Sequence, residues 1–191
     1  MRYGKDQKQA TRQRILQAAG RRFKQDGIDG AGVAAVMSDA GLTNGAFYVH
    51  FDSKEDLVQA VLGDALEQRA RGLQGNLERH QSLKESLRDY LSTRHRDNAA
   101  LGCPTAALVA EIARHPAKTQ GIFTGSVERI VLLIAARLRH GTDAERRRKA
   151  MAIYGMMVGS LQMARAVNDP KLSSEILENA LEGAITLAGE D

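Results

Sequence analysis

The sequence has one cysteine, three prolines, no tryptophan and only 4% aromatic residues among its 191 residues. A single cysteine excludes an internal disulfide framework and any metal site built from several cysteines. No apolar run approaches the ~18 residues that a membrane-spanning helix needs, and the basic, polar N-terminus lacks the core of a signal peptide. We therefore expect a protein of the cytoplasm that makes no contact with a membrane.

Positive charge is concentrated at the front of the chain. The net charge is +4, and residues 1–50 carry eight Lys and Arg against four Asp, so the rest of the chain is balanced. A basic front on a neutral body is typical of a head that binds a polyanion and a body with another task. The alternative is a solvated basic helix face without a partner.

Helical signals run along the whole chain, and no strand-like alternation is present. The pattern predicts an all-α fold of about nine helices. Capping residues, glycines and prolines at helix starts support these bounds. The expected helices are 8–26, 33–40, 43–50, one from 54 to the 72–75 region, 82–97, 104–114, 117–140, 143–167 and 171–188.

The segment from Val33 to Phe51 is the most informative part of the chain. It reads as a short helix, a sharp turn at Gly41 and a second short helix that Thr43 would cap. Ser53 would cap the next helix, with Asp56 in the reciprocal capping position. Two short helices joined so tightly form a helix-turn-helix, which inserts its second helix into a DNA major groove.

The polar positions of this unit are the candidate DNA-binding residues. The apolar residues expected to lock the two helices together are Val36, Ala40, Leu42 and Phe47. The residues left to face DNA are Thr43, Asn44, Gly45, Tyr48, His50 and, at the next helix start, Lys54. Asn44 suits a base edge, and Tyr48, His50 and Lys54 suit phosphates. The alternative is that Tyr48 and His50 pack inside the protein.

The segments TRQRILQAAGRRFKQDG and GLTNGAFYVHFDSKEDL closely resemble the N-terminal DNA-binding domain of TetR/AcrR-type transcriptional regulators. The resemblance covers about residues 10–62. It implies a homodimer with a three-helix DNA-binding head, here residues 1–52, and a helical ligand-binding and dimerisation body, residues 53–191. Its DNA-facing positions match the six residues named above. Gly32 and Met37 depart from the family pattern, which usually has Ser or Thr and Ala there.

The body would hold a small, partly apolar effector that releases the protein, a repressor, from double-stranded DNA with a palindromic operator. Candidate lining residues are Leu108, Phe123, Tyr154 and Met157, although apolar residues of this kind also build plain core. No cofactor is expected.

The last two predicted helices are apolar and carry small residues at four-residue spacings. These residues are Gly155, Gly159, Ala180 and Ala184. Such helices, two from each subunit, would form a four-helix dimer interface, as the resemblance implies. The alternative is that they complete the core of a monomer.

Cys103 supports a second functional hypothesis. It precedes Pro104 at a predicted helix start, with Arg94, His95 and Arg96 close in sequence, so a thiol-based redox or electrophile sensor could act through it. The alternative is a small buried cysteine that packs a loop. An enzyme is not expected, because Glu111 and His115 lack a third metal ligand or a nucleophile, and no metal site is predicted.

Overall fold

The computed structural model describes residues 2–79 and 81–189, which are helical with short connections and contain no strand. Nine α-helices and two 3-10 helices follow one another in the described chain. They are α1 (Arg2–Asp26), α2 (Val33–Asp39), η1 (Asn44–Val49), α3 (Lys54–Glu78), α4 (Leu83–Tyr90), α5 (Thr93–Asp97), η2 (Ala99–Leu101), α6 (Pro104–Ile112), α7 (Ala117–Ala135), α8 (Asp143–Ala166) and α9 (Pro170–Ala188). The predicted all-α fold class is confirmed.

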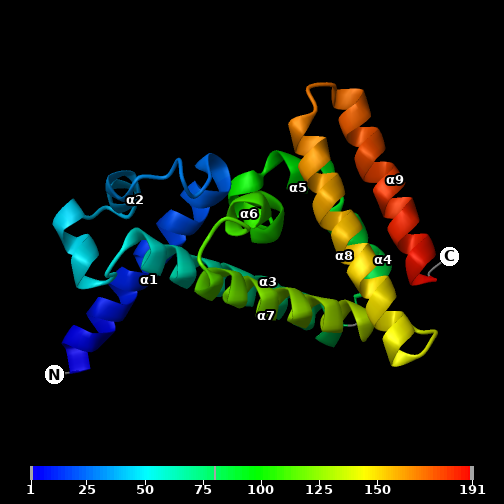
Figure 1. Cartoon of the computed structure of the whole chain (residues 1–191), viewed down its shortest axis with the longest axis horizontal. Coiled ribbons are helices and arrows are strands. Elements are labelled where there is room, and N and C mark those ends of the chain that lie inside the picture. Colours follow the sequence, from blue (N-terminus) through cyan, green and yellow to red (C-terminus); the bar gives the residue numbers. More distant parts are fainter. Residues whose placement is uncertain (1, 80, 190–191) are drawn as a thin grey trace.

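The molecule has two ends joined by a long helix (Figure 1). α1, α2 and η1 form the head, and α8 and α9 pack as a pair at the opposite end. α3 begins in the head and runs beside α7 into the body, while α6 lies between the head and α8. No described helix is both long enough and apolar enough to cross a membrane.

Two hydrophobic clusters hold these parts together, and their boundary lies deeper than residue 52. The head cluster continues along α3 to Leu66 and takes in Leu108 and Ile112 of α6. The body cluster is built mainly from α4, α7, α8 and α9. The first half of α3 therefore packs with the head, and α6 contributes Leu108 and Ile112 to the head cluster and Ala106 to the body cluster.

Several helix ends follow the predicted caps. Thr142 and Glu145 form a capping box at α8, and the Asp169 carboxylate accepts from the backbone N–H groups of Lys171 and Leu172 at α9. Ser53 Oγ accepts from the N–H of Asp56 at 3.1 Å. These bonds satisfy helix N–H groups that lack a partner within the helix.

Three predicted helices were wrong in detail. The helix expected over 117–140 ends at Ala135. The helix expected over 82–97 is broken, because Leu91 leaves the helical conformation and Ser92 starts α5 by accepting from the N–H of His95. The helix expected over 43–50 is the 3-10 helix η1, and the Thr43 side chain makes no capping hydrogen bond. A run of only six residues that contains Gly45 has little to gain from the α-form.

Candidate functional site

The head is locked by a buried apolar interior. Val36, Met37 and Phe47 are essentially inaccessible, Ala40 is buried, and Leu42 packs against them half-buried. The ring of Phe47 stacks on that of Phe51, with centroids 5.7 Å apart. The predicted locking residues are confirmed, and the Met37 side chain is fully buried in this interior.

The turn between α2 and η1 depends on Gly41. Its φ is +66°, in the left-handed region that glycine adopts most readily. Arg14 of α1 donates to the carbonyl oxygen of Ala40 at 2.6 Å and so holds the end of α2 against α1. The turn therefore packs η1 against α2, with Phe47 in the head interior.

Four of the six predicted DNA-facing residues are exposed together on η1 and its start. They are Thr43, Asn44, Gly45 and Tyr48. The Tyr48 side chain is 73% exposed, so the alternative that it packs inside is wrong. A Cβ added to Gly45 would meet nothing within 4 Å, so this position offers an unobstructed approach to a partner.

His50 is neither fully exposed toward a DNA partner nor fully packed inside the protein. It is half-buried, and its Nδ1 is covered without a hydrogen-bond partner among the described residues. Burial, with smaller contributions from Lys8 and Arg12, lowers the pKa of His50. An acceptor brought from outside, such as a phosphate oxygen, would favour the protonated ring.

Lys54 is the first residue of α3. Its Nζ donates to the carbonyl oxygen of Asp29 at 3.4 Å, which orients the ammonium on the head surface. The Asp56 carboxylate accepts from the N–H of Asp52 at 3.3 Å, one residue before the reciprocal bond expected from the sequence. The N-cap of α2, Gly32, supplies no side-chain bond, as its residue type implies.

Helix α6 connects the head to the body through a carboxylate that the sequence did not single out for this task. Glu111 Oε2 accepts from the backbone N–H groups of Ile28 at 2.7 Å and of Asp29 at 3.1 Å. Both N–H groups belong to the loop between α1 and α2. Leu108 and Ile112, on the same helix, are buried in the head cluster, so α6 is both packed against the head and hydrogen-bonded to it.

A second polar link joins the start of α3 to the body. Glu55 accepts from Thr119 of α7, and its Oε2 lies 2.9 Å from Nδ1 of His115. Glu111 and His115 therefore serve different contacts and do not form the pair that a metal site would use. Within the described residues no group of three or more metal-binding side chains occurs.

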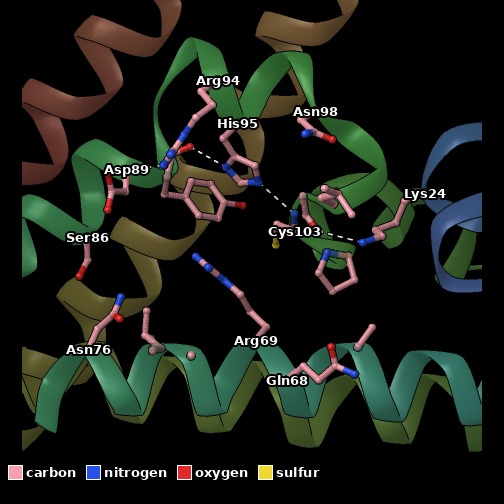
Figure 2. A pocket seen from close by; sticks show the side chains of 17 residues that line it. Lys24, Gln68, Arg69, Asn76, Ser86, Asp89, Arg94, His95, Asn98 and Cys103 are labelled. Carbon is pink, nitrogen blue, oxygen red and sulfur yellow. Dashed lines mark hydrogen bonds and ion pairs between the residues drawn. The ribbon is translucent and has the colours of Figure 1, made fainter. Parts of the chain in front are cut away.

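A cavity with a volume of about 580 Å³ lies between α3, the α4–α6 segment and the end of α1 (Figure 2). Its polar lining includes three cations from different elements. The charged or titratable side chains at its wall are Lys24, Arg69, Asp89, Tyr90, Arg94, His95 and Cys103. Figure 2 shows Arg69 rising from α3 into the space and Lys24 entering it from α1.

The four residues predicted to line a ligand site do not come together and do not line this cavity. Leu108 is buried in the head cluster, and Phe123 packs against that cluster. Tyr154 and Met157 belong to the body cluster, where the Tyr154 hydroxyl donates to Thr105 at 2.8 Å. Helical periodicity predicts that these residues are buried. Whether a buried residue lines a cavity depends on how the helices pack against one another.

Cys103 is buried and lines the cavity at the start of α6. Its backbone N–H donates to Nε2 of His95 at 2.9 Å, and the His95 Nδ1 lies 2.7 Å from the carbonyl oxygen of Tyr90. Burial lowers the pKa of His95, so the neutral ring with its proton on Nδ1 satisfies both bonds. Of the three residues expected near Cys103 from the sequence, His95 contacts it directly.

The two arginines expected near Cys103 have other partners. Arg96 is bonded to Asp97 and to the hydroxyl of Ser173, and Arg94 is exposed, 4.0 Å from Asp89. Other cations around Cys103 come from distant parts of the chain: Lys24 and Arg69 line the same cavity, and Arg165 interacts electrostatically with the thiol. Residues so far apart in sequence gave no signal from which this grouping could be predicted.

The small residues of the last two helices separate into two groups. Ala180 and Ala184 are buried in the body cluster, so they serve the packing of α8 on α9 within one chain. Gly155 is exposed and Gly159 half-exposed, and a Cβ at either would meet nothing within 4 Å. Met151, Met163 and Leu172 are also exposed on this pair, at 46%, 55% and 44%.

The geometry of the head defines a helix-turn-helix protein, and the comparisons with known proteins agree. Residues 15–61 match the family described as "Bacterial regulatory proteins, tetR family". The regulator TtgR of Pseudomonas putida is 43% identical over 58 residues, which is 30% of this chain and 28% of TtgR. AcrR of Shigella flexneri is 40% identical over 57 residues, which is 30% of this chain and 26% of AcrR. The chain thus spans less than a third of these relatives.

Solved structures extend the likeness in fold to nearly the whole chain. The reduced form of Escherichia coli NemR superposes with a TM-score of 0.76 and 22% identity, covering 93% of this chain and 96% of NemR. A TetR-family regulator from Agrobacterium tumefaciens gives a TM-score of 0.75 and 22% identity, covering 92% and 98%. The head is therefore similar in sequence to the DNA-binding domain of the tetR family, and nearly the whole chain shares the fold of these solved structures. The named relatives are transcriptional regulators, in agreement with the expectation that this chain is not an enzyme.

Proposed function

We propose that the protein is a transcriptional repressor that binds a palindromic DNA operator as a homodimer and is released by a small molecule. The observation that carries this proposal is the exposed polar face of η1, held out by the buried head interior and flanked by oriented Lys54. Binding to chromosomal DNA would place the protein in the cytoplasm. The residue range of each functional unit, 1–52 for DNA and 53–191 for ligand and partner, is part of the proposal.

Each residue of that face has a proposed role. Asn44 reads a base edge, because its amide offers a donor and an acceptor side by side. Thr43 and Gly45 allow close approach, since neither covers the backbone with a large side chain. Tyr48, His50 and Lys54 contact phosphates, which position the head without reading sequence.

The dimer would form through α8 and α9. Their exposed methionines and Leu172 lie beside glycines that leave space for a partner helix, a combination that suits close helix packing. A two-fold pair would present two heads about one helical turn of DNA apart, roughly 34–36 Å.

Release would operate through α6. Its first residues border the cavity at Cys103 and Pro104, and its last turn holds the head loop through Glu111. A ligand that shifts the start of α6 therefore changes the position of the head, and with it the spacing of the two heads. Only a ligand with different affinities for the two arrangements can do this.

Selection of bound fragments from the source genome, with purified full-length protein at near-physiological salt, tests the proposal. We expect the natural chain to enrich one or a few inverted repeats. Asn44→Ala should enrich none of them or should select a different sequence. Salt-sensitive binding with no preferred sequence would contradict it, as would enrichment that Asn44→Ala leaves unaltered.

The second candidate is a thiol-based sensor on the same DNA-binding frame. It is favoured by one observation, the position of Cys103 at the wall of the cavity beside Lys24 and Arg69. Operator release by a mild oxidant or an electrophile, compared between the natural chain and Cys103→Ser, separates the candidates. A repressor governed by a reversible ligand keeps its response in the variant, whereas a thiol sensor loses it.

A further inference from the structure

The guanidinium of Arg69 is the unusual group in the cavity. Arg69 is half-buried on α3, and its Cζ lies 5.1 Å from the centre of the Tyr90 ring. Among the described residues no carboxylate pairs with it. Its neighbour Arg71, by contrast, lies on the surface and pairs with Glu67 at 2.8 Å. A half-buried guanidinium that packs on an aromatic ring keeps donors free for a carboxylate, with which it forms stronger hydrogen bonds.

Tyr90 supplies a second donor at the same place. The residue is 2% exposed, and among the described residues its buried hydroxyl has no hydrogen-bond partner other than the thiol of Cys103. The neighbouring Cys103 thiol is only a weak hydrogen-bonding group. Buried hydroxyls are normally paired, so one with only a thiol partner at a cavity wall marks a place for an acceptor.

The surrounding charge is mainly positive. The pKa values of Lys24 and Arg165 are lowered, mainly by burial. The electrostatic interaction of each side chain with Cys103 acts in the opposite direction. Arg165 donates hydrogen bonds to the carbonyl oxygens of His95 and Arg96, which are uncharged acceptors. The one acid at the wall, Asp89, is exposed and belongs to Arg94 at the outer end.

From this arrangement we propose that the cavity binds a small organic carboxylate, with its anionic group between the Arg69 guanidinium and the Tyr90 hydroxyl. The volume of about 580 Å³ admits a ligand with a substantial apolar part, for which Ala65, Leu73, Leu101 and Pro104 provide the wall. The proposal rests on the proposed function in one respect, that this carboxylate is the effector.

The same site indicates how binding of an anion in the cavity affects the head. Lys24 belongs to α1, and its Nζ donates to the carbonyl oxygen of Gly102 at 3.4 Å. An anion in the cavity competes for this ammonium, because a charged acceptor forms the stronger hydrogen bond. The contact between α1 and the segment before α6 then changes, at the end of α6 opposite to Glu111.

Binding is tested by calorimetry on the full-length protein without DNA, with benzoate, 2-naphthoate and octanoate, each against its uncharged primary amide. At least one carboxylate should bind about ten-fold or more tightly than its amide, as a charge-assisted bond implies. Binding of each amide as well as its carboxylate, or of no carboxylate, overturns the proposal.

Three variants locate the anionic group. Arg69→Gln should remove the preference for the carboxylate. Tyr90→Phe deletes a hydroxyl whose only partner is the weakly bonding Cys103 thiol, so it should weaken binding about five-fold without lowering Tm. Arg71→Gln is the matched control on the same helix and should bind as the natural chain does. Cys103→Ser should also retain binding. Unchanged affinity in both Arg69→Gln and Tyr90→Phe would contradict the site.

The DNA experiment is kept separate, so the two proposals can fail independently. Carboxylate binding that Arg69→Gln abolishes, in a protein that selects no operator, would uphold the cavity site and reject the repressor. Operator binding without carboxylate binding would do the reverse. Where both hold, the bound carboxylate should lower operator affinity in the natural chain and not in Arg69→Gln.

Discussion

The backbone N–H of Cys103 donates to Nε2 of His95, which ties the start of α6 to α5 over 2.9 Å. A ring nitrogen that accepts a hydrogen bond cannot also carry a proton. Protonation of His95 therefore breaks this contact, and with it one fixed point of the helix that connects the cavity to the head.

Stability should fall as the pH drops below the ordinary histidine value. Burial lowers the pKa of His95 in the folded chain, so the unfolded chain binds its proton first. The stabilisation is complete above the unfolded pKa of about 6.5 and is lost as the pH falls toward the folded pKa. The free energy of unfolding in urea, measured between about pH 7.5 and about pH 5.5, should decline less in His95→Gln than in the natural chain. His140→Gln, at an exposed position, is the control and should decline as the natural chain does.

Removal of the Lys54 charge should lower the salt dependence of operator binding. The ammonium is oriented on the head surface by Asp29 and is assigned to a phosphate. In Lys54→Ala, the slope of log affinity against log salt should decrease by about one for each subunit. Lys118→Ala, an exposed cation on α7, should leave the slope unchanged. Equal slopes in all three proteins would remove Lys54 from the interface.

Loss of the Glu111 carboxylate should loosen the head without unfolding the body. Its two bonds to Ile28 and Asp29 join an ionised acceptor to backbone donors, a type worth about 2 kcal/mol. In Glu111→Ala, amide hydrogen exchange at these two N–H groups should accelerate, while exchange in α8 and α9 stays slow. Glu128→Ala, an exposed acid on α7, serves as the control. Protection that persists at both amides would show that α6 does not hold the loop.

A charge placed on the exposed face of α8 should separate the proposed dimer. Met163 is 55% exposed in one chain and would be covered by the partner. A buried glutamate without a partner is costly, so Met163→Glu should be monomeric at micromolar concentration by light scattering. Val49→Glu, an equally exposed apolar position on η1, should remain dimeric. A dimeric Met163→Glu would place the interface elsewhere.

The sequence by itself determined the elements whose signals are local. Thr142 with Glu145, and Asp169 with Pro170, mark helix starts because caps act within three residues. Gly41 marks the turn because φ of +66° strains a residue with a Cβ. The exposed set on η1 followed from the same local periodicity, once Val36 and Phe47 were assigned to the interior. The break at Leu91–Ser92 also had a local signal in Ser92, which the prediction overlooked.

Only the tertiary structure decided where the cavity lies and what lines it. Lys24, Arg69, Tyr90 and Cys103 come from four helices or their starts, and no periodicity relates residues that meet through helix crossing. For the same reason Leu108, expected at a ligand, packs in the head core, because α6 crosses between head and body. Local sequence fixes which face of a helix is apolar, whereas long-range packing selects what that face meets.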